Sequence, residues 1–81
     1  MSSSTYQVVA FWDEEASVWV ATSDDVPGLV TEAETIEVLS QKLHVMIPEL
    51  LVLNQVIPEN HHEPIAFKLT SERQEQIKVA S

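Results

Sequence analysis

The three histidines are the first residues to consider for chemistry, because imidazole nitrogens are common metal ligands. His61 and His62 are adjacent and lie between Glu59 and Glu63. A metal site needs ligands that converge on one ion, and neighbouring side chains rarely do so. His44 lies beside the apolar stripe of a predicted helix, where a histidine usually has a structural or solvent-facing role. We therefore expect no metal site and interpret the His-His segment as a solvated loop. Metal or small-molecule binding through His61 and His62 is the third of three functional hypotheses.

The sequence lacks the other common arrangements of catalytic residues. Asp24 and Asp25 could pair as acid and base, but adjacent side chains on an extended chain diverge. No serine has the surroundings of a nucleophile elbow. The chain has one glycine and no cysteine, which excludes a glycine-rich phosphate loop, disulfides and thiolate metal sites. We expect a protein that is not an enzyme and needs no cofactor.

Charge is the most informative bulk property. The formal net charge is −9, and residues 1–41 contain eight acidic residues with no lysine or arginine. Such a segment repels phosphate backbones and attracts basic protein surfaces. This disfavours direct nucleic-acid binding, although acidic charge can also serve solubility alone. The residues that we expect to bind a partner are acidic side chains and two tryptophans that could anchor it: Asp24, Asp25, Glu14, Glu15, Trp12 and Trp19.

The length of 81 residues allows one small domain, a size at which proteins often gain stability by oligomerising. We expect a disordered tail at 1–5, a single domain at 6–71 and a polar tail at 72–81. The first residues lack a signal peptide's basic segment and apolar core, and no apolar run approaches the ~18 residues of a membrane helix. The lack of cysteine fits a reducing compartment, so we expect a cytoplasmic protein that binds no membrane.

The first half predicts a β-hairpin. Residues 6–12 and 18–23 are rich in β-forming residues, and 13–17 form a polar turn between them. Neither predicted strand has a fully polar face. Since one helix can cover only one face of the sheet, a second subunit or a partner should cover the other.

A Pro-Gly turn follows the hairpin. Val26-Pro27-Gly28-Leu29 fits a type II turn, because proline suits its second position and glycine accepts the positive φ of its third. Alternation over 29–34 then predicts a short strand. Thr35 is placed to cap the next helix, as its hydroxyl can accept a bond from a free backbone N–H.

The rest of the chain predicts one helix and one strand. Apolar residues at helical spacing give a core-facing stripe from Ile36 to Leu53, with Asn54 as terminator. The stripe consists of Leu39, Leu43, Met46, Leu50 and Leu53, widened by Ile36, Ile47 and Leu51. Pro48 should kink the helix or start a second segment. After a loop at 55–64, alternation over 65–70 predicts a fourth strand, which could pair within its own chain or across a dimer.

Three segments together resemble a small bacterial family placed in the HicB-like antitoxin superfamily. They are Phe11-Trp12-Asp13-Glu14-Glu15-Ala16-Ser17-Val18-Trp19-Val20-Ala21, the segment from Asp24 to Thr35, and Ile47-Pro48-Glu49-Leu50-Leu51, and the resemblance covers about 6–70. It implies an α+β fold of order β-β-β-α-β, a partial relative of the double-stranded-RNA-binding fold. We expect an antiparallel sheet with one long helix packed on one face.

The resemblance also implies a non-enzymatic protein, commonly a homodimer or higher oligomer. HicB-type antitoxins bind a small basic mRNA-cleaving ribonuclease of the HicA type and cover its active site. They typically carry a C-terminal DNA-binding domain as well, and because few residues follow the fourth strand here we expect neither that domain nor operator binding. The leading hypothesis is therefore an antitoxin-like protein-binding module. The alternative is a stand-alone homo-oligomer with a structural or ligand-binding role and no toxin partner.

Overall fold

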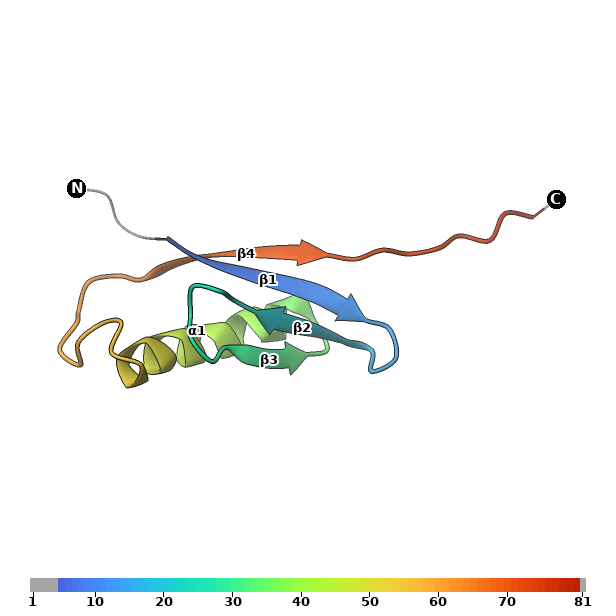
Figure 1. Cartoon of the computed structure of the whole chain (residues 1–81). Helices are drawn as coiled ribbons and strands as arrows, with labels where there is room; N and C mark the ends of the chain where they lie inside the picture. The colour runs from blue at the N-terminus through green and yellow to red at the C-terminus, as the bar shows by residue number, and fades with distance from the viewer. Residues whose placement is uncertain (1–4, 81) are drawn as a thin grey trace.

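The molecule is a four-stranded sheet with one helix, and its chain order is β-β-β-α-β (Figure 1). The computed structural model describes residues 5–80. Its elements are β1 (Thr5–Asp13), β2 (Val18–Thr22), β3 (Val30–Ala33), α1 (Ile36–Leu53) and β4 (Ala66–Glu72). The expected α+β class and element order are confirmed.

The spatial order of the strands is β3-β2-β1-β4. β1 pairs with β2 and β2 with β3 in antiparallel ladders, whereas β4 lies parallel to β1 with Thr5 opposite Ala66 and Phe11 opposite Glu72. The expectation of a purely antiparallel sheet is therefore wrong. The reason is that α1, about 27 Å long at 1.5 Å per residue, carries the chain back along the sheet after β3. β4 must then run in the direction of β3, which is also that of β1.

The turn between β1 and β2 is held by Asp13. Its carbonyl accepts a hydrogen bond from the Ser17 N–H at 2.8 Å, and its carboxylate accepts one from the Ala16 N–H at 3.2 Å. Ser17 has φ 57°, the left-handed value that closes the turn. The expected polar turn at 13–17 is thus confirmed.

The Pro-Gly turn joins the sheet to the far end of the helix. The Leu29 N–H bonds to the Val26 carbonyl at 3.2 Å and Gly28 has φ 78°, the geometry expected of a type II turn. Val26 and Leu29 are both buried, so the turn places two apolar side chains in the core. Asn54 caps the helix C-terminus and directs its side-chain amide to the Pro27 carbonyl at 3.4 Å.

Helix α1 begins at the expected cap. The Thr35 hydroxyl accepts a hydrogen bond from the Val38 N–H at 3.1 Å, and Glu37 lies in the first turn, where the helix dipole favours an anion. The helix continues through Pro48, so no second segment starts there.

The apolar stripe of α1 is centred differently from the expected one. The fully buried side chains are spaced four residues apart, at Leu39, Leu43, Ile47 and Leu51. Ile36, Met46 and Leu50 pack at the margins of this row. Leu53, expected in the stripe, is 75% exposed, because it follows the buried Leu51 by two residues and therefore points about 160° away from it around the helix.

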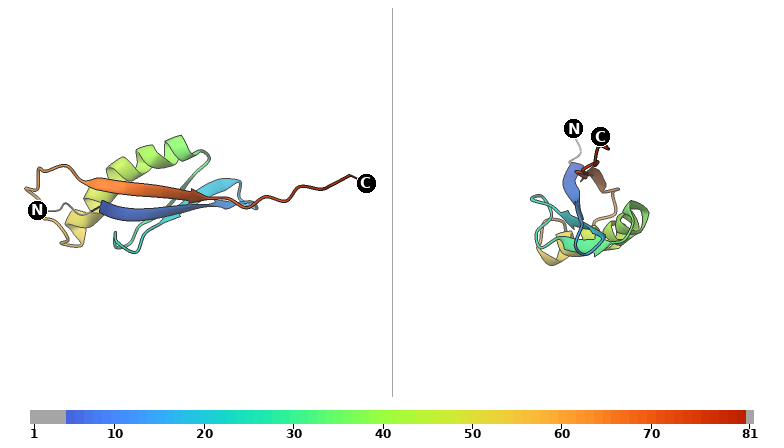
Figure 2. Two further views of the ribbon diagram at one scale, coloured as in Figure 1. Left: turned by 90° about the horizontal axis from the view of Figure 1, so that it is seen from above. Right: turned by 90° about the vertical axis from the view of Figure 1, so that its right-hand side faces the viewer.

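The helix covers one face of the sheet, and the core lies between these two layers (Figures 1 and 2). The strands contribute small or branched side chains from alternate positions, namely Val8, Ala10, Ala21 and Ala33. Within residues 5–80, no helix combines the length and apolar character needed to cross a membrane.

The ends of the chain differ slightly from the expected domain limits. β1 already includes Thr5 and β4 includes Glu72, while the rest of the expected disordered tail, 1–4, lies outside the described residues. Residues 73–80 are extended and exposed and lead away from the sheet (Figure 2). This segment is less uniformly polar than expected, since it carries Ile77 and Val79.

Candidate protein-binding surface

The two tryptophans lie together at the β1–β2 turn, on the side of the sheet that the helix covers. Trp12 and Trp19 are cross-strand partners, and their rings meet edge to face with centroids 5.5 Å apart. The guanidinium of Arg73, just after β4, stacks over the Trp12 ring at 4.1 Å from its centroid. This is cation–π geometry, and it holds the start of the C-terminal segment against the hairpin. Both tryptophans are half-buried, so they support the sheet end more than they project from it.

Asp24 and Asp25 lie at the other end of β2. The Asp25 carboxylate accepts a hydrogen bond from the Gln7 N–H at 2.7 Å, and the Ser23 hydroxyl donates to the Gln7 carbonyl. The side chains of Asp25 and Ser23 thus continue the pairing of β1 with β2 beyond the last backbone pair, Val9 and Thr22. Asp25 therefore has a structural contact, whereas Asp24 is exposed and has no hydrogen bond in the described structure.

The expected partner-binding residues thus do not form one cluster. Glu14 and Glu15, beside the tryptophans, are exposed in the β1–β2 turn, and Asp24 follows the opposite end of β2. Sequence proximity suggested a single acidic hairpin surface. An antiparallel strand of five residues places its two flanking turns at opposite ends of the sheet.

The sheet face opposite the helix carries an apolar patch that has no cover within the described chain. We call Val9, Phe11, Val20 and Val30 the open-face patch. Phe11 lies opposite Val20, and Thr22 lies between Val9 and Val30 in the neighbouring row. Val30 is 67% exposed and Phe11 44%, values far above those of the buried side chains on the covered face.

Carboxylates border this patch on both sides. The strand register puts Glu32 of β3 beside Val20 and Glu72 of β4 beside Phe11, so an acidic side chain stands at each edge of one row. An exposed apolar centre with a charged rim is the composition of a protein-binding surface. None of the four residues of the patch was named as a candidate residue from the sequence, but the apolar groups on both faces of the predicted hairpin were the signal that could have identified them.

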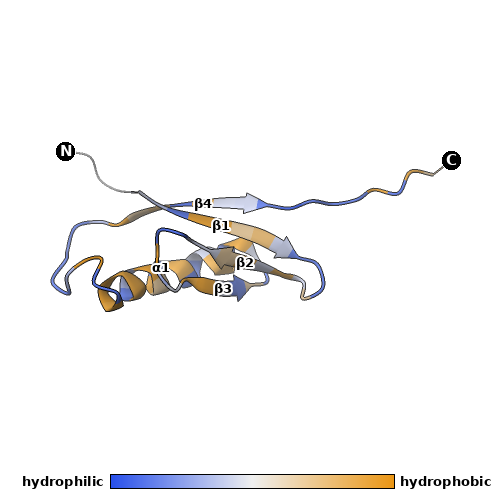
Figure 3. Ribbon diagram, viewed as in Figure 1, coloured by the Kyte–Doolittle hydropathy of each residue, from blue (hydrophilic) through white to orange (hydrophobic). Residues whose placement is uncertain are grey.

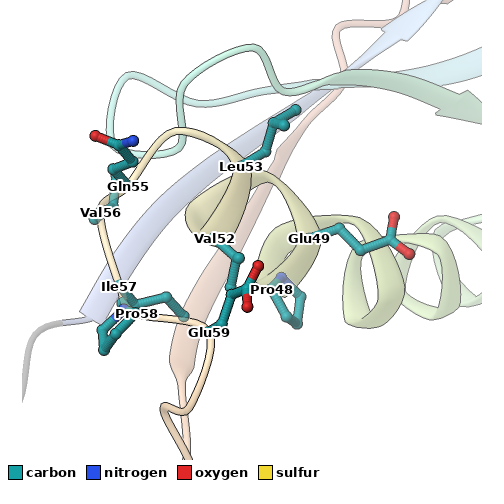
Figure 4. Close-up of a pocket in the computed structure, with 9 residues that line it drawn as sticks. All are labelled: Pro48, Glu49, Val52, Leu53, Gln55, Val56, Ile57, Pro58 and Glu59. Carbon is teal, nitrogen blue, oxygen red and sulfur yellow. The ribbon is translucent and has the colours of Figure 1, made fainter.

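A second apolar hollow lies at the C-terminal end of α1, between the last helical turns and the following loop (Figure 4). It has a volume of about 970 Å³ and its apolar wall includes Pro48, Val52, Leu53, Val56 and Ile57. The polar side chains at the hollow are Glu49, Gln55 and Glu59, and they do not belong to any potential metal-ligating group of three among the described residues.

The histidines lie in separate surroundings. His44 has Nδ1 2.8 Å from the Ser40 carbonyl and its ring against Phe67 of β4, and His62 has Nδ1 2.8 Å from the Asn60 carbonyl. Among residues 5–80, no three His, Cys, Asp or Glu side chains gather as a potential metal site. This geometry gives no support to the metal-binding hypothesis for His61 and His62.

Comparison with known proteins gives a family but no activity. Residues 5–81 match the model of the family described as Domain of unknown function (DUF1902). The fold is similar to the crystal structure of hypothetical protein TTHA1013 from the extremely thermophilic bacterium Thermus thermophilus, with a TM-score of 0.71 and 47% identity over 91% of this chain and 100% of that one. No curated protein matches the sequence. A family match over almost the whole chain leads to one conclusion: this protein is a member of the DUF1902 family.

Proposed function

We propose that this protein is a non-enzymatic, antitoxin-like binding module of the cytoplasm that neutralises a small basic ribonuclease of the HicA type. With this we propose that its family belongs to the HicB-like superfamily. The observation that carries the proposal is the open-face patch with its acidic rim. The β-β-β-α-β order and the residues quoted for the resemblance support the same assignment.

The chemistry of the open face suits a basic protein partner. Phe11 offers a large, half-exposed aromatic side chain at the middle of the sheet, the kind of residue that anchors interfaces. Glu32 and Glu72 beside it can pair with arginine or lysine at the rim. A ribonuclease that binds RNA presents cationic side chains, so its surface is complementary to this one.

The acidic first half would act mainly on the rate of association. Complementary charge steers two proteins together and raises the association rate constant, and this effect weakens as salt is added. Glu14, Glu15 and Asp24 are exposed and free for this role, whereas Asp25 also holds β1. Neutralisation follows physically, because a partner whose cationic surface is covered cannot bind its RNA substrate.

The proposal is tested by recovering the partner and measuring its activity. Tagged protein isolated from native cells should carry a small basic protein in defined stoichiometry, and that protein, once purified, should cleave mRNA. Adding this protein back at an equimolar amount should stop the cleavage. A partner with no ribonuclease activity, or cleavage unaffected by this protein, would contradict the proposal.

Two matched variants then locate the interface. Phe11→Ala should weaken binding by at least about tenfold, a change of about 1.4 kcal/mol, since it removes a central aromatic contact. Leu53→Ala removes a still more exposed apolar side chain far from the open face and should leave binding unchanged. Equal effects of both variants would exclude the open face as the binding surface.

A stand-alone homo-oligomer is the second candidate function. The specific observation in its favour is the extended C-terminal segment, which contacts little of its own subunit. Recovery of only self-assembled protein from native cells would favour this candidate over the antitoxin.

A further inference from the structure

Beyond Arg73, which stacks on Trp12, the C-terminal segment packs little against its own subunit. Residues 73–80, hereafter the arm, continue β4 in an extended conformation beyond the end of the sheet (Figures 1 and 2). Ile77 is 88% exposed and Val79 84%, and the hydropathy colouring shows apolar positions near the tip of the arm (Figure 3). A single extended segment leaves its backbone N–H and C=O groups unpaired and is a template for pairing with another strand.

The side-chain pattern of the arm continues that of β4. Phe67 and Leu69 point from β4 toward the helix side, where they pack against the core. Because side chains alternate along an extended chain, Ile77 and Val79 lie on the same side. The two apolar pairs are also symmetric about Arg73, with Leu69 and Ile77 four residues from it and Phe67 and Val79 six.

This symmetry matches antiparallel pairing of two copies. If a two-fold axis passes beside Arg73, Ile77 of each copy lies opposite Leu69 of the other, and Val79 lies opposite Phe67. Directly opposite side chains on one face are the pairs that stabilise a sheet. A closed two-fold contact of this kind uses the same surface on both copies.

The outer edge of β4 is free to accept such a strand. β4 pairs with β1 on one side only, and its other edge has no partner strand in the described chain. Its seven residues match the eight of the arm in length, whereas the free edge at β3 offers four. The arm therefore fits the β4 edge better than the β3 edge.

Charge opposes a second copy less at this surface than at the first half of the chain, although the register above sets Lys68 of each copy opposite Lys78 of the other and Arg73 opposite Arg73. Residues 66–81 carry three basic and two acidic side chains, whereas 1–65 carry one basic and eleven acidic ones. Two copies that meet through β4 and the arm thus join along the one segment that is not strongly acidic. A contact through the first half of the chain would place many like charges together.

The subunit exposes more surface than a compact monomer of its mass would, which also indicates an interface. The radius of gyration is 15.5 Å, compared with about 12 Å for a compact domain of this length. The accessible surface is 6257 Å², compared with roughly 4,900 Å² expected for a folded monomer of this mass. The excess exceeds the roughly 800 Å² that each partner buries in a typical stable interface.

We propose that the arm and the outer edge of β4 form the interface of a two-fold homodimer, in which each arm lies along β4 of the other copy. The two sheets join into one continuous sheet with both helices on the same side. Both open-face patches then lie on the opposite side, free of the interface, so dimerisation and binding of a basic partner use separate surfaces. The inference goes beyond the proposed function and does not depend on it.

Light scattering on the purified full chain tests the dimer. The wild-type protein should have twice the monomer mass of 9.1 kDa. Ile77→Lys combined with Val79→Lys should reduce the mass to that of a monomer. These side chains are more than four-fifths exposed in their own subunit, so circular dichroism should show an unchanged fold. A monomeric wild type, or a double variant that stays dimeric, would overturn the proposal.

The matched control adds the same charge to the other side of the arm. Gln74→Lys combined with Gln76→Lys should remain dimeric, because position 74 then lies opposite Glu72 of the second copy. If this control is a monomer, added positive charge on either side of the arm prevents dimerisation. The apolar side of the arm is then not the docking surface, and the proposal is contradicted. Open-ended polymers of the wild type would also contradict it and would indicate addition to the β3 edge.

A single introduced thiol tests the position of the axis. The chain has no cysteine, so Arg73→Cys reports one contact only. At a two-fold axis the two Cα atoms lie about 4.5–5.5 Å apart, within the range of a disulfide. Mild oxidation should give a covalent dimer, whereas Asp24→Cys, at the opposite end of β2 from the tryptophans and Arg73, should not. Equal cross-linking of both variants would refute the proposed position of the axis. So would an Arg73→Cys protein that is dimeric but forms no disulfide.

Discussion

The two faces of the sheet are built from the same strands but meet different surroundings. In β1, Val8 and Ala10 are buried under the helix, whereas their neighbours Val9 and Phe11 remain 40% and 44% exposed. Both sets are apolar, so hydrophobicity alone does not decide which is buried. One helix is enough to cover one face, and no other part of the described chain, residues 5–80, covers the second.

This difference separates stability from binding. Side chains on the covered face contribute mainly to the free energy of unfolding, because they lose their contact with water on folding. Those on the open face contribute little to the isolated subunit and are available to a partner. The following variants test that separation, in order of decreasing expected effect.

The largest effect is expected in the middle of the covered face. Leu43 is fully buried in the central row of α1. Leu43→Ala should lower the free energy of unfolding by about 2–5 kcal/mol, the usual cost of a cavity of this size. Chemical denaturation measures the change. A loss below about 1 kcal/mol would mean that the helix does not form the principal cover of the sheet.

A matched pair in β1 compares the two faces directly. Val8→Ala and Val9→Ala make the same chemical change at adjacent positions, and both lose the same β-propensity. Val8 is 1% exposed and Val9 40%. The Val8 variant should be the less stable of the two by about 1–2 kcal/mol, the difference in apolar burial. Equal losses in a monomeric preparation would contradict the assignment of faces.

The Pro-Gly turn should show a smaller effect through backbone strain. A Cβ at Gly28 would lie 3.7 Å from the Leu50 side chain, an ordinary contact, but φ is 78°. Gly28→Ala should therefore cost about 1–2 kcal/mol, whereas Gly28→Asn should cost less, since asparagine tolerates this conformation better. Thermal unfolding compares the two. If asparagine is the more destabilising, steric contact and not φ controls this turn.

The smallest effect is expected at the acidic pair that ends the ladder. Asp25→Ala removes the acceptor for the Gln7 N–H and should cost about 1 kcal/mol, while Asp24→Ala should stay within about 0.5 kcal/mol. Denaturant titration of both variants at the same ionic strength makes the comparison. A larger loss for Asp24 would reverse the roles that the geometry gives them.

Much of the local structure was predictable from the sequence. The turn at Pro27 and Gly28 and the cap at Thr35 were identified correctly, because each depends on bonds that span three or four residues. The extent of α1 was also predicted well. The exposed position of Leu53 was not, because several apolar rows on α1 fit a helical spacing, and only packing decides which row faces the sheet.

The candidate surface was less predictable. Six residues chosen for charge and aromaticity proved to lie at two ends of β2, and Asp25 has a structural contact. The patch at Val9, Phe11, Val20 and Val30 joins three strands, so it requires the register between them. Alternation within one strand indicates two faces, but it does not indicate which face the helix covers.

The sequence by itself determined the elements, the two-faced character of the hairpin and the acidic first half, since these follow from residue type and short-range spacing. Only the tertiary structure placed β4 parallel to β1 at the edge of the sheet and left the arm without a partner strand among the described residues of its own subunit. The physical reason is that strand pairing joins residues about 60 positions apart, such as Thr5 and Ala66. Such contacts are chosen by the packing of the whole chain, which no local pattern of residues can specify.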